Sequence, residues 1–144
     1  MKAITILQPF ATLIASGEKH FETRSWKTDY RGPLLIHAGK GTQYMYLCEQ
    51  KSFKNILEEY GYIKDNLPLG AIIAKVKLVD CIKVTHEDGM EAQLENDFIT
   101  RTKEYIFGDY TPGRYAWQLE DVEILKEPIP VKGQQRLWNY KGEI

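Results

Sequence analysis

The chain of 144 residues lacks long apolar runs, paired cysteines and internal repeats. No apolar segment approaches the roughly 20 residues that a membrane-spanning helix needs, and the N-terminus lacks the basic, apolar and small-residue pattern of a signal peptide. Cys48 and Cys81 are its two cysteines, and their separation indicates neither a zinc knuckle nor a disulfide framework. We therefore expect a cytoplasmic protein with two reduced core thiols, no metal, no cofactor and no membrane partner.

The chain also lacks an excess of charge of one sign. Its formal net charge of −1 argues against a wide basic surface that would bind any nucleic acid through release of counterions. Residues 17–40 nevertheless contain five basic side chains against three acidic ones. A small basic site on a neutral body suits a short or single-nucleotide anionic ligand better than a long duplex.

Apolar residues follow two different periods along the chain, which predicts an α+β fold in a single domain over residues 1–144. Helical spacing predicts a short helix between Pro9 and Gly17 and a longer one over 43–60, and residues 86–110 are expected to form a loop followed by a helix. Strands that pair mainly antiparallel are expected at residues 2–7, 20–26, 34–38, 70–83 and 114–125. Their alternation predicts six nearly fully buried side chains: Ile6, Phe21, Ile36, Ile72, Val76 and Leu78.

The segment "GEKHFETR", residues 17–24, places three charged side chains close together at the start of one of these strands. Side chains alternate along a strand, so Glu22, Arg24 and Trp26 share one face and Thr23 lies on the other. Lys19 lies in the turn that leads into the strand. A solvated strand face with a surface ion pair would explain this pattern as well as a binding site does.

Four blocks of the chain resemble the ASCH (activating signal cointegrator homology) domain, and the likeness covers nearly the whole sequence. The blocks are "ILQPFATLIASGEKHFETRSW", "RGPLLIHAGK", "GAIIAKVKLVDC" and "GRYAWQLEDVEIL". The GxKxxExR hallmark of the family is met by Gly17, Lys19, Glu22 and Arg24. The resemblance implies a PUA-like fold, a small and mostly antiparallel β-barrel with surrounding helices, and a cleft to which this segment contributes.

The resemblance also implies a role in binding RNA or nucleotides. In such a cleft, Lys19 and Arg24 would donate to a phosphate or a base carbonyl, and Glu22 would accept from an exocyclic amine or orient Arg24. Trp26 would stack on a base, with His37 at the border of the site. The expected ligand-binding residues are therefore Lys19, Glu22, Arg24, Trp26, His37 and Lys40.

Catalysis is the alternative that the sequence leaves open. Some bacterial proteins that this chain resembles hydrolyse amides on modified nucleosides such as N4-acetylcytidine, with a Thr nucleophile three positions after the Lys. That position is Glu22 here, so the remaining form of this chemistry has Glu22 as general base and Lys19 stabilising the oxyanion. A ribonuclease would draw its acid and base from Lys19, His20, Glu22 and His37. We favour a binding module over either enzyme.

Overall fold

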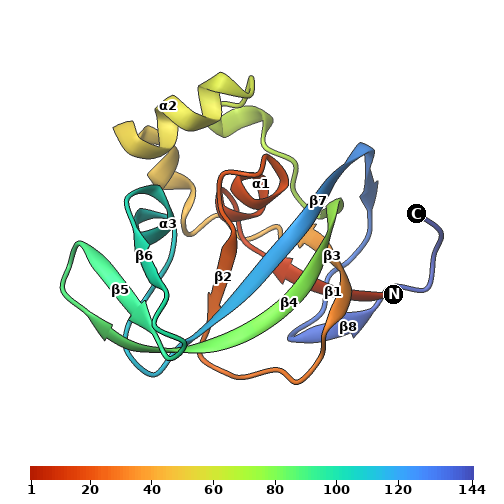
Figure 1. Cartoon of the computed structure of the whole chain (residues 1–144). Coiled ribbons are helices and arrows are strands. Elements are labelled where there is room, and N and C mark those ends of the chain that lie inside the picture. Colours follow the sequence, from red (N-terminus) through yellow and green to blue (C-terminus); the bar gives the residue numbers. More distant parts are fainter.

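The computed structural model describes all residues 1–144 as an α+β fold built on one large mixed sheet (Figure 1). The strands are β1 (Lys2–Ile6), β2 (Phe21–Arg24), β3 (Gly32–Ala38), β4 (Ala71–Glu87), β5 (Glu91–Leu94), β6 (Ile99–Arg101), β7 (Tyr115–Pro130) and β8 (Leu137–Asn139). The α-helices are α1 (Phe10–Ala15), α2 (Lys51–Glu59) and α3 (Lys103–Ile106), and the 3₁₀ turns are η1 (Met45–Glu49) and η2 (Lys64–Asn66).

The sheet runs in the order β2-β7-β4-β3-β1-β8, and β5 and β6 extend it beside the far end of β4. Every pairing is antiparallel except β1 with β3, so the expectation of mainly antiparallel strands is confirmed. The long strands β4 and β7 pair along most of their length, with three irregularities in register. Closure into a barrel is not confirmed, because β2 and β8 stand at the two ends of this order and do not pair with each other.

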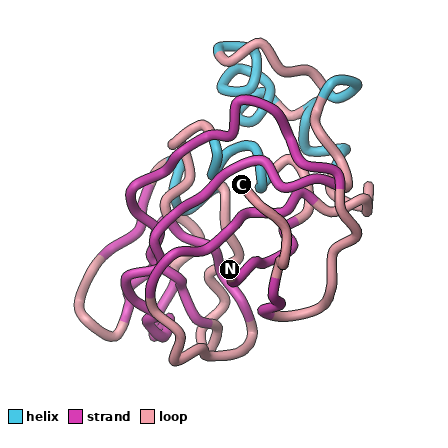
Figure 2. Tube along the Cα trace, turned by 90° about the vertical axis from the view of Figure 1, so that its right-hand side faces the viewer, coloured by secondary structure: helices cyan, strands magenta, loops and turns pink.

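Helix α2 lies at the top of the molecule in Figure 1, above the strands, and the short helices α1 and α3 lie lower, beside the strands; Figure 2 shows the same two groups of helical turns. Helix α1 packs against β3, β4 and β7, whereas α2 packs against η1. None of the helices is both long and apolar enough to cross a bilayer. The chain ends lie on one face (Figure 2), where the Met1 ammonium donates to the Tyr140 carbonyl at 2.9 Å.

The core forms where the alternation of apolar residues predicted it. All six side chains that were expected to be buried are at most 4% exposed, because each faces inward from a strand. The two cysteines are free and buried, as expected. Those six side chains are Ile6, Phe21, Ile36, Ile72, Val76 and Leu78.

Three local expectations were wrong. In residues 86–110 the β5–β6 hairpin replaces the expected loop, because a turn with Asp97 at a φ of 70° follows β5 and reverses the chain, whereas the expected helix is present as the short α3. The helix expected over 43–60 is divided, since Gln50 has an extended ψ of 135° between η1 and α2. Strand β2 ends at Arg24 instead of continuing to residue 26.

We predict that Ile36→Ala lowers the free energy of unfolding by about 2–5 kcal/mol, because it removes a fully buried side chain and leaves a cavity. Ile124→Ala is the matched control. Ile124 is 58% exposed on β7, so its truncation should change stability by less than about 0.5 kcal/mol. Urea unfolding measures both, and equal losses in the two variants would contradict the assigned core.

Candidate functional site

Lys19 is positioned by a tight turn at the end of α1. Gly17 has a φ of 84°, the left-handed conformation that was expected where this helix ends. The backbone N–H groups of Glu18 and Lys19 then both donate to the Leu13 carbonyl at 3.0 Å. This turn directs the Lys19 side chain into the protein, where it is only 1% exposed.

The Lys19 ammonium is buried with few partners. Its Nζ donates to the Phe107 carbonyl at 2.6 Å and lies 5.7 Å from the centre of the Phe10 ring. Burial lowers the pKa of Lys19 from its ordinary value, and the carboxylates of Glu22 and Glu104 partly oppose this shift. Two of the three N–H donors of the ammonium have no hydrogen-bond partner within the protein.

Glu22 and Arg24 lie on one face of β2, as alternation predicted, and they are hydrogen-bonded. Arg24 Nε donates to Glu22 Oε2 at 2.9 Å, and Arg24 Nη2 donates to the Thr5 carbonyl at 2.7 Å. The guanidinium therefore links β2 to β1, although these strands are separated in the sheet. Glu22 Oε1 has no hydrogen-bond partner within the protein, so it can accept from a ligand.

These three side chains line one cleft of about 560 Å³. The sequence did not indicate the rest of its wall, which comes from residues 5–10, 44–53 and 106–114, three segments that no local pattern connects with the motif. The added residues include five aromatic rings and a second ion pair, whose Arg114 Nε lies 3.6 Å from Asp109 Oδ2. They are Phe10, Tyr44, Tyr46, Phe53, Phe107, Asp109 and Arg114.

Trp26 does not line this cleft, contrary to the sequence-based expectation. Because β2 ends at Arg24, the chain bends at Ser25 and the Trp26 ring leaves the face shared by Glu22 and Arg24. The ring packs edge-on against Trp117, with centroids 4.8 Å apart, and Arg136 lies over it at 4.6 Å. Trp26 is therefore partly buried against the main hydrophobic core and is not placed to stack on a base in the cleft.

His37 and Lys40 are also outside the cleft and line a second cavity. His37 is on β3, which pairs with β1, and Thr5 of β1 lines both the cleft and this second cavity. His37 is 2% exposed, with Nδ1 3.1 Å from Thr5 Oγ1 and Nε2 2.7 Å from the Val131 carbonyl. Burial lowers the pKa of His37, and the bond to Val131 partly opposes that effect.

The remaining catalytic candidates are dispersed. His20 Nδ1 pairs with Glu104 Oε1 at 2.9 Å at an exposed position outside the cleft. Thr23 borders the cleft as well, against the expectation that it faces away, and its Oγ1 accepts from the Asp109 N–H at 3.1 Å. No basic side chain is hydrogen-bonded to the Thr23 hydroxyl. Nor does the structure contain a group of three or more His, Cys, Asp or Glu residues placed to hold a metal ion.

Comparisons with known proteins agree on one relationship. The sequence model of the ASCH domain family matches residues 4–132 of this chain. Activating signal cointegrator 1 of Mus musculus is 24% identical and that of Homo sapiens 23% identical, each over 143 residues. Both matches cover 98% of this chain and 22% of the relative, so the chain spans about a fifth of the length of these curated relatives.

Solved structures show the same fold at low sequence identity. The crystal structure of ASCH from Zymomonas mobilis gives a TM-score of 0.55 at 16% identity, covering 97% of this chain and 87% of that one. The crystal structure of a mutant form of the Zymomonas mobilis protein gives a TM-score of 0.51 at 16% identity, covering 97% and 90%. This likeness concerns the fold alone.

We predict that Arg24→Lys lowers the free energy of unfolding by about 1–2 kcal/mol, because Arg24 bonds Glu22 through Nε and the Thr5 carbonyl through Nη2, and the single Nζ of lysine does not reproduce these two separated donors. Arg101→Lys is the control. Arg101 pairs with Glu91 at 3.3 Å on the surface, with 61% of its side chain exposed, and its replacement should cost less than about 0.5 kcal/mol. Urea unfolding of both variants is the measurement, and an unchanged Arg24→Lys midpoint would contradict the bridging role.

A second prediction concerns pH. The pKa of His37 is lower in the folded protein than its ordinary value of 6.5, so the unfolded chain takes up the proton first as pH falls. The free energy of unfolding should therefore fall as the pH is lowered from about 7.5 to about 5.5. In His37→Gln it should fall less over the same range. His86→Gln, at an exposed position, should leave the pH dependence unchanged. Urea unfolding across this range tests the assignment, and identical pH profiles for wild type and His37→Gln would overturn it.

Proposed function

Because the chain belongs to the ASCH domain family, we propose that its Lys19–Glu22–Arg24 cleft binds a nucleotide of RNA. The observation that carries the proposal is the pairing of unused groups: Lys19 has free N–H donors, and Glu22 has a free acceptor oxygen. Both groups lie in a cleft rimmed by aromatic rings. A donor beside an acceptor is what recognition of an unpaired base edge requires.

The donor on Lys19 and the acceptor on Glu22 restrict which bases the cleft can recognise. Lys19 can donate to a carbonyl, while Glu22 can accept from an amine. Cytosine and guanine each carry a carbonyl and an exocyclic amine on the edge used for pairing, whereas adenine has no carbonyl. The cleft therefore suits cytosine, guanine or a derivative of either.

The aromatic rim supports the same proposal. Tyr44 is 41% exposed and Tyr46 is 58% exposed, and both line the cleft. A large exposed ring costs free energy in water, and stacking on a base would recover about 1–3 kcal/mol. These tyrosines take the role that the sequence had suggested for Trp26.

Hydrolysis of a modified base is the second candidate, favoured by the burial of Lys19. A desolvated ammonium in a cleft is suited to stabilise a developing oxyanion, with Glu22 activating a water molecule. A Thr23 nucleophile is disfavoured because its hydroxyl has no adjacent base. A ribonuclease is disfavoured because His20 and His37 lie outside the cleft.

We predict that Lys19→Met abolishes ligand binding without lowering stability. The lowered pKa means that folding disfavours the Lys19 ammonium, so an apolar side chain of similar length should be tolerated or stabilising. Thermal shift against nucleosides, nucleotides, acylated and methylated nucleosides and short RNAs identifies the ligand, and calorimetry then compares the variants. Lys103→Met, which removes an exposed lysine that pairs with Glu18, is the control and should bind normally.

Glu22→Gln separates binding from catalysis. For a binding module, loss of the carboxylate should weaken ligand binding, because glutamine offers one acceptor oxygen where Glu22 offers two, so either the Arg24 guanidinium or the base amine loses its acceptor. If Glu22→Gln binds a modified nucleoside normally but stops its turnover, the hydrolase replaces the binding module. If Lys19→Met retains full affinity, the cleft is not the site.

A further inference from the structure

The second cavity, of about 840 Å³, is lined by basic and amide groups without a carboxylate. It lies between the ends of β1 and β3 and the segment 130–135 at the end of β7. Its charged side chains are Lys40 and Lys132, and neither makes an ion pair or hydrogen bond within the protein. An anion would find two uncompensated cations there and no repelling group.

A hydrogen-bonded chain of side chains fixes the wall of this cavity. Trp138 Nε1–H donates to Thr5 Oγ1 at 3.2 Å, Thr5 Oγ1 lies 3.1 Å from His37 Nδ1, and His37 Nε2 lies 2.7 Å from the Val131 carbonyl. A carbonyl only accepts, so the Val131 bond requires the proton on Nε2 and leaves Nδ1 to accept from the Thr5 hydroxyl. Both His37 nitrogens are therefore occupied, and His37 holds the segment instead of binding a ligand.

Gly133 brings the backbone of this segment against the same wall. A Cβ at Gly133 would lie 2.5 Å from Thr5 Oγ1 and 2.6 Å from His37 Cε1, so only glycine fits. The backbone N–H groups of residues 132–136 donate no hydrogen bond within the protein. Successive free N–H groups held in place beside lysines are a common arrangement for binding phosphate.

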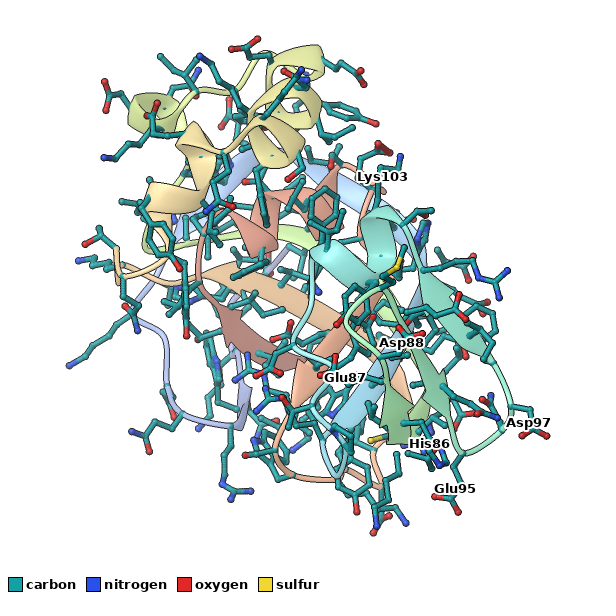
Figure 3. All side chains as sticks on the ribbon, turned by 90° about the vertical axis from the view of Figure 1, so that its left-hand side faces the viewer. His86, Glu87, Asp88, Glu95, Asp97 and Lys103 are labelled. Atoms are coloured by element: carbon teal, nitrogen blue, oxygen red, sulfur yellow. The ribbon has the colours of Figure 1, made fainter.

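The second cavity and the cleft meet at Thr5, which lines both. The Thr5 carbonyl accepts from Arg24 of the cleft, and the Thr5 hydroxyl bonds His37 of the cavity. The two sites are therefore adjacent, and a ligand that fills the cleft can extend past Thr5 into the cavity. The acidic side chains labelled in Figure 3 surround the β5–β6 hairpin, on the side of the molecule away from β8 in Figure 1, where they do not repel such a ligand; they are Glu87, Asp88, Glu95 and Asp97.

We propose that this second cavity binds a backbone phosphate of the same RNA whose base enters the cleft, so that the ligand is a single strand of at least two nucleotides. Lys40, Lys132 and the N–H groups of residues 133–135 supply the donors. The base contact rests on the function proposed above, whereas the phosphate site rests on its own donors. A duplex is not the expected ligand, because its bases are already paired.

Amide chemical shifts of the ¹⁵N-labelled full chain test this inference, with two probes. A pool of random-sequence RNA pentanucleotides should shift residues 132–136 together with the cleft residues. Tripolyphosphate, which has no base, should shift residues 132–136 and leave Phe107 and Asp109 unchanged. The double variant Lys40→Ala/Lys132→Ala should lose the shifts of residues 132–136 with both probes.

Binding of the fluorescein-labelled pool, followed by anisotropy, gives the magnitude. The double variant should bind about tenfold more weakly or worse in about 50 mM salt, and the slope of log K against log salt should fall by about 0.7, the value for one lost phosphate contact on a single strand. The control Lys77→Ala/Lys83→Ala removes two exposed lysines that line neither cavity and should keep wild-type affinity and slope. Melting temperatures of both double variants verify that they fold.

The outcomes separate the two proposals. If RNA shifts the cleft but not residues 132–136, or if both double variants bind alike, the phosphate site is overturned and the cleft stands. If tripolyphosphate shifts residues 132–136 in the wild type alone, but no RNA or nucleoside shifts the cleft, the phosphate site stands and the proposed function fails.

Discussion

The Arg24 guanidinium makes the contact on which the rest of the site depends. Strands β2 and β1 are first and fifth in the sheet order, so backbone hydrogen bonds do not join them. Arg24 spans the distance with one donor on Glu22 and another on the Thr5 carbonyl. The planar guanidinium therefore joins β2 to β1 through a side chain and at the same time orients the Glu22 carboxylate in the cleft.

Arg24 stabilises the fold, whereas the buried Lys19 ammonium lowers its stability. A buried ammonium with a single carbonyl partner costs free energy that an apolar side chain would not. The fold tolerates this cost because the surrounding strands are well packed and because Glu22 and Glu104 lie near enough to offset part of it. An uncompensated donor is also what allows the site to gain free energy when a ligand arrives.

Much of the sheet was predictable because alternation of apolar residues is a local signal. The proximity of Lys19, Glu22 and Arg24 was also predictable, because these residues lie within six positions of one another in a turn and the strand that follows it. The placement of Trp26 was wrong because nothing local marks Arg24 as the last residue of β2. His37 and Lys40 were placed in the wrong cavity because their position depends on the order of strands β1 and β3, which periodicity does not contain. The aromatic rim was missed for the same reason, since tertiary folding alone brings its segments to the motif.

The pairing of the chain ends has a mechanical consequence. Lys2 at the start of β1 lies opposite Asn139 at the end of β8, in an antiparallel pair. Tension between the two ends would therefore load the hydrogen bonds of this pair one after another, as in a zipper, instead of all together. The first element to peel away would be β8, which carries Trp138 and its bond to Thr5. A pull on the termini would thus loosen the wall of the second cavity before it disturbs the rest of the sheet.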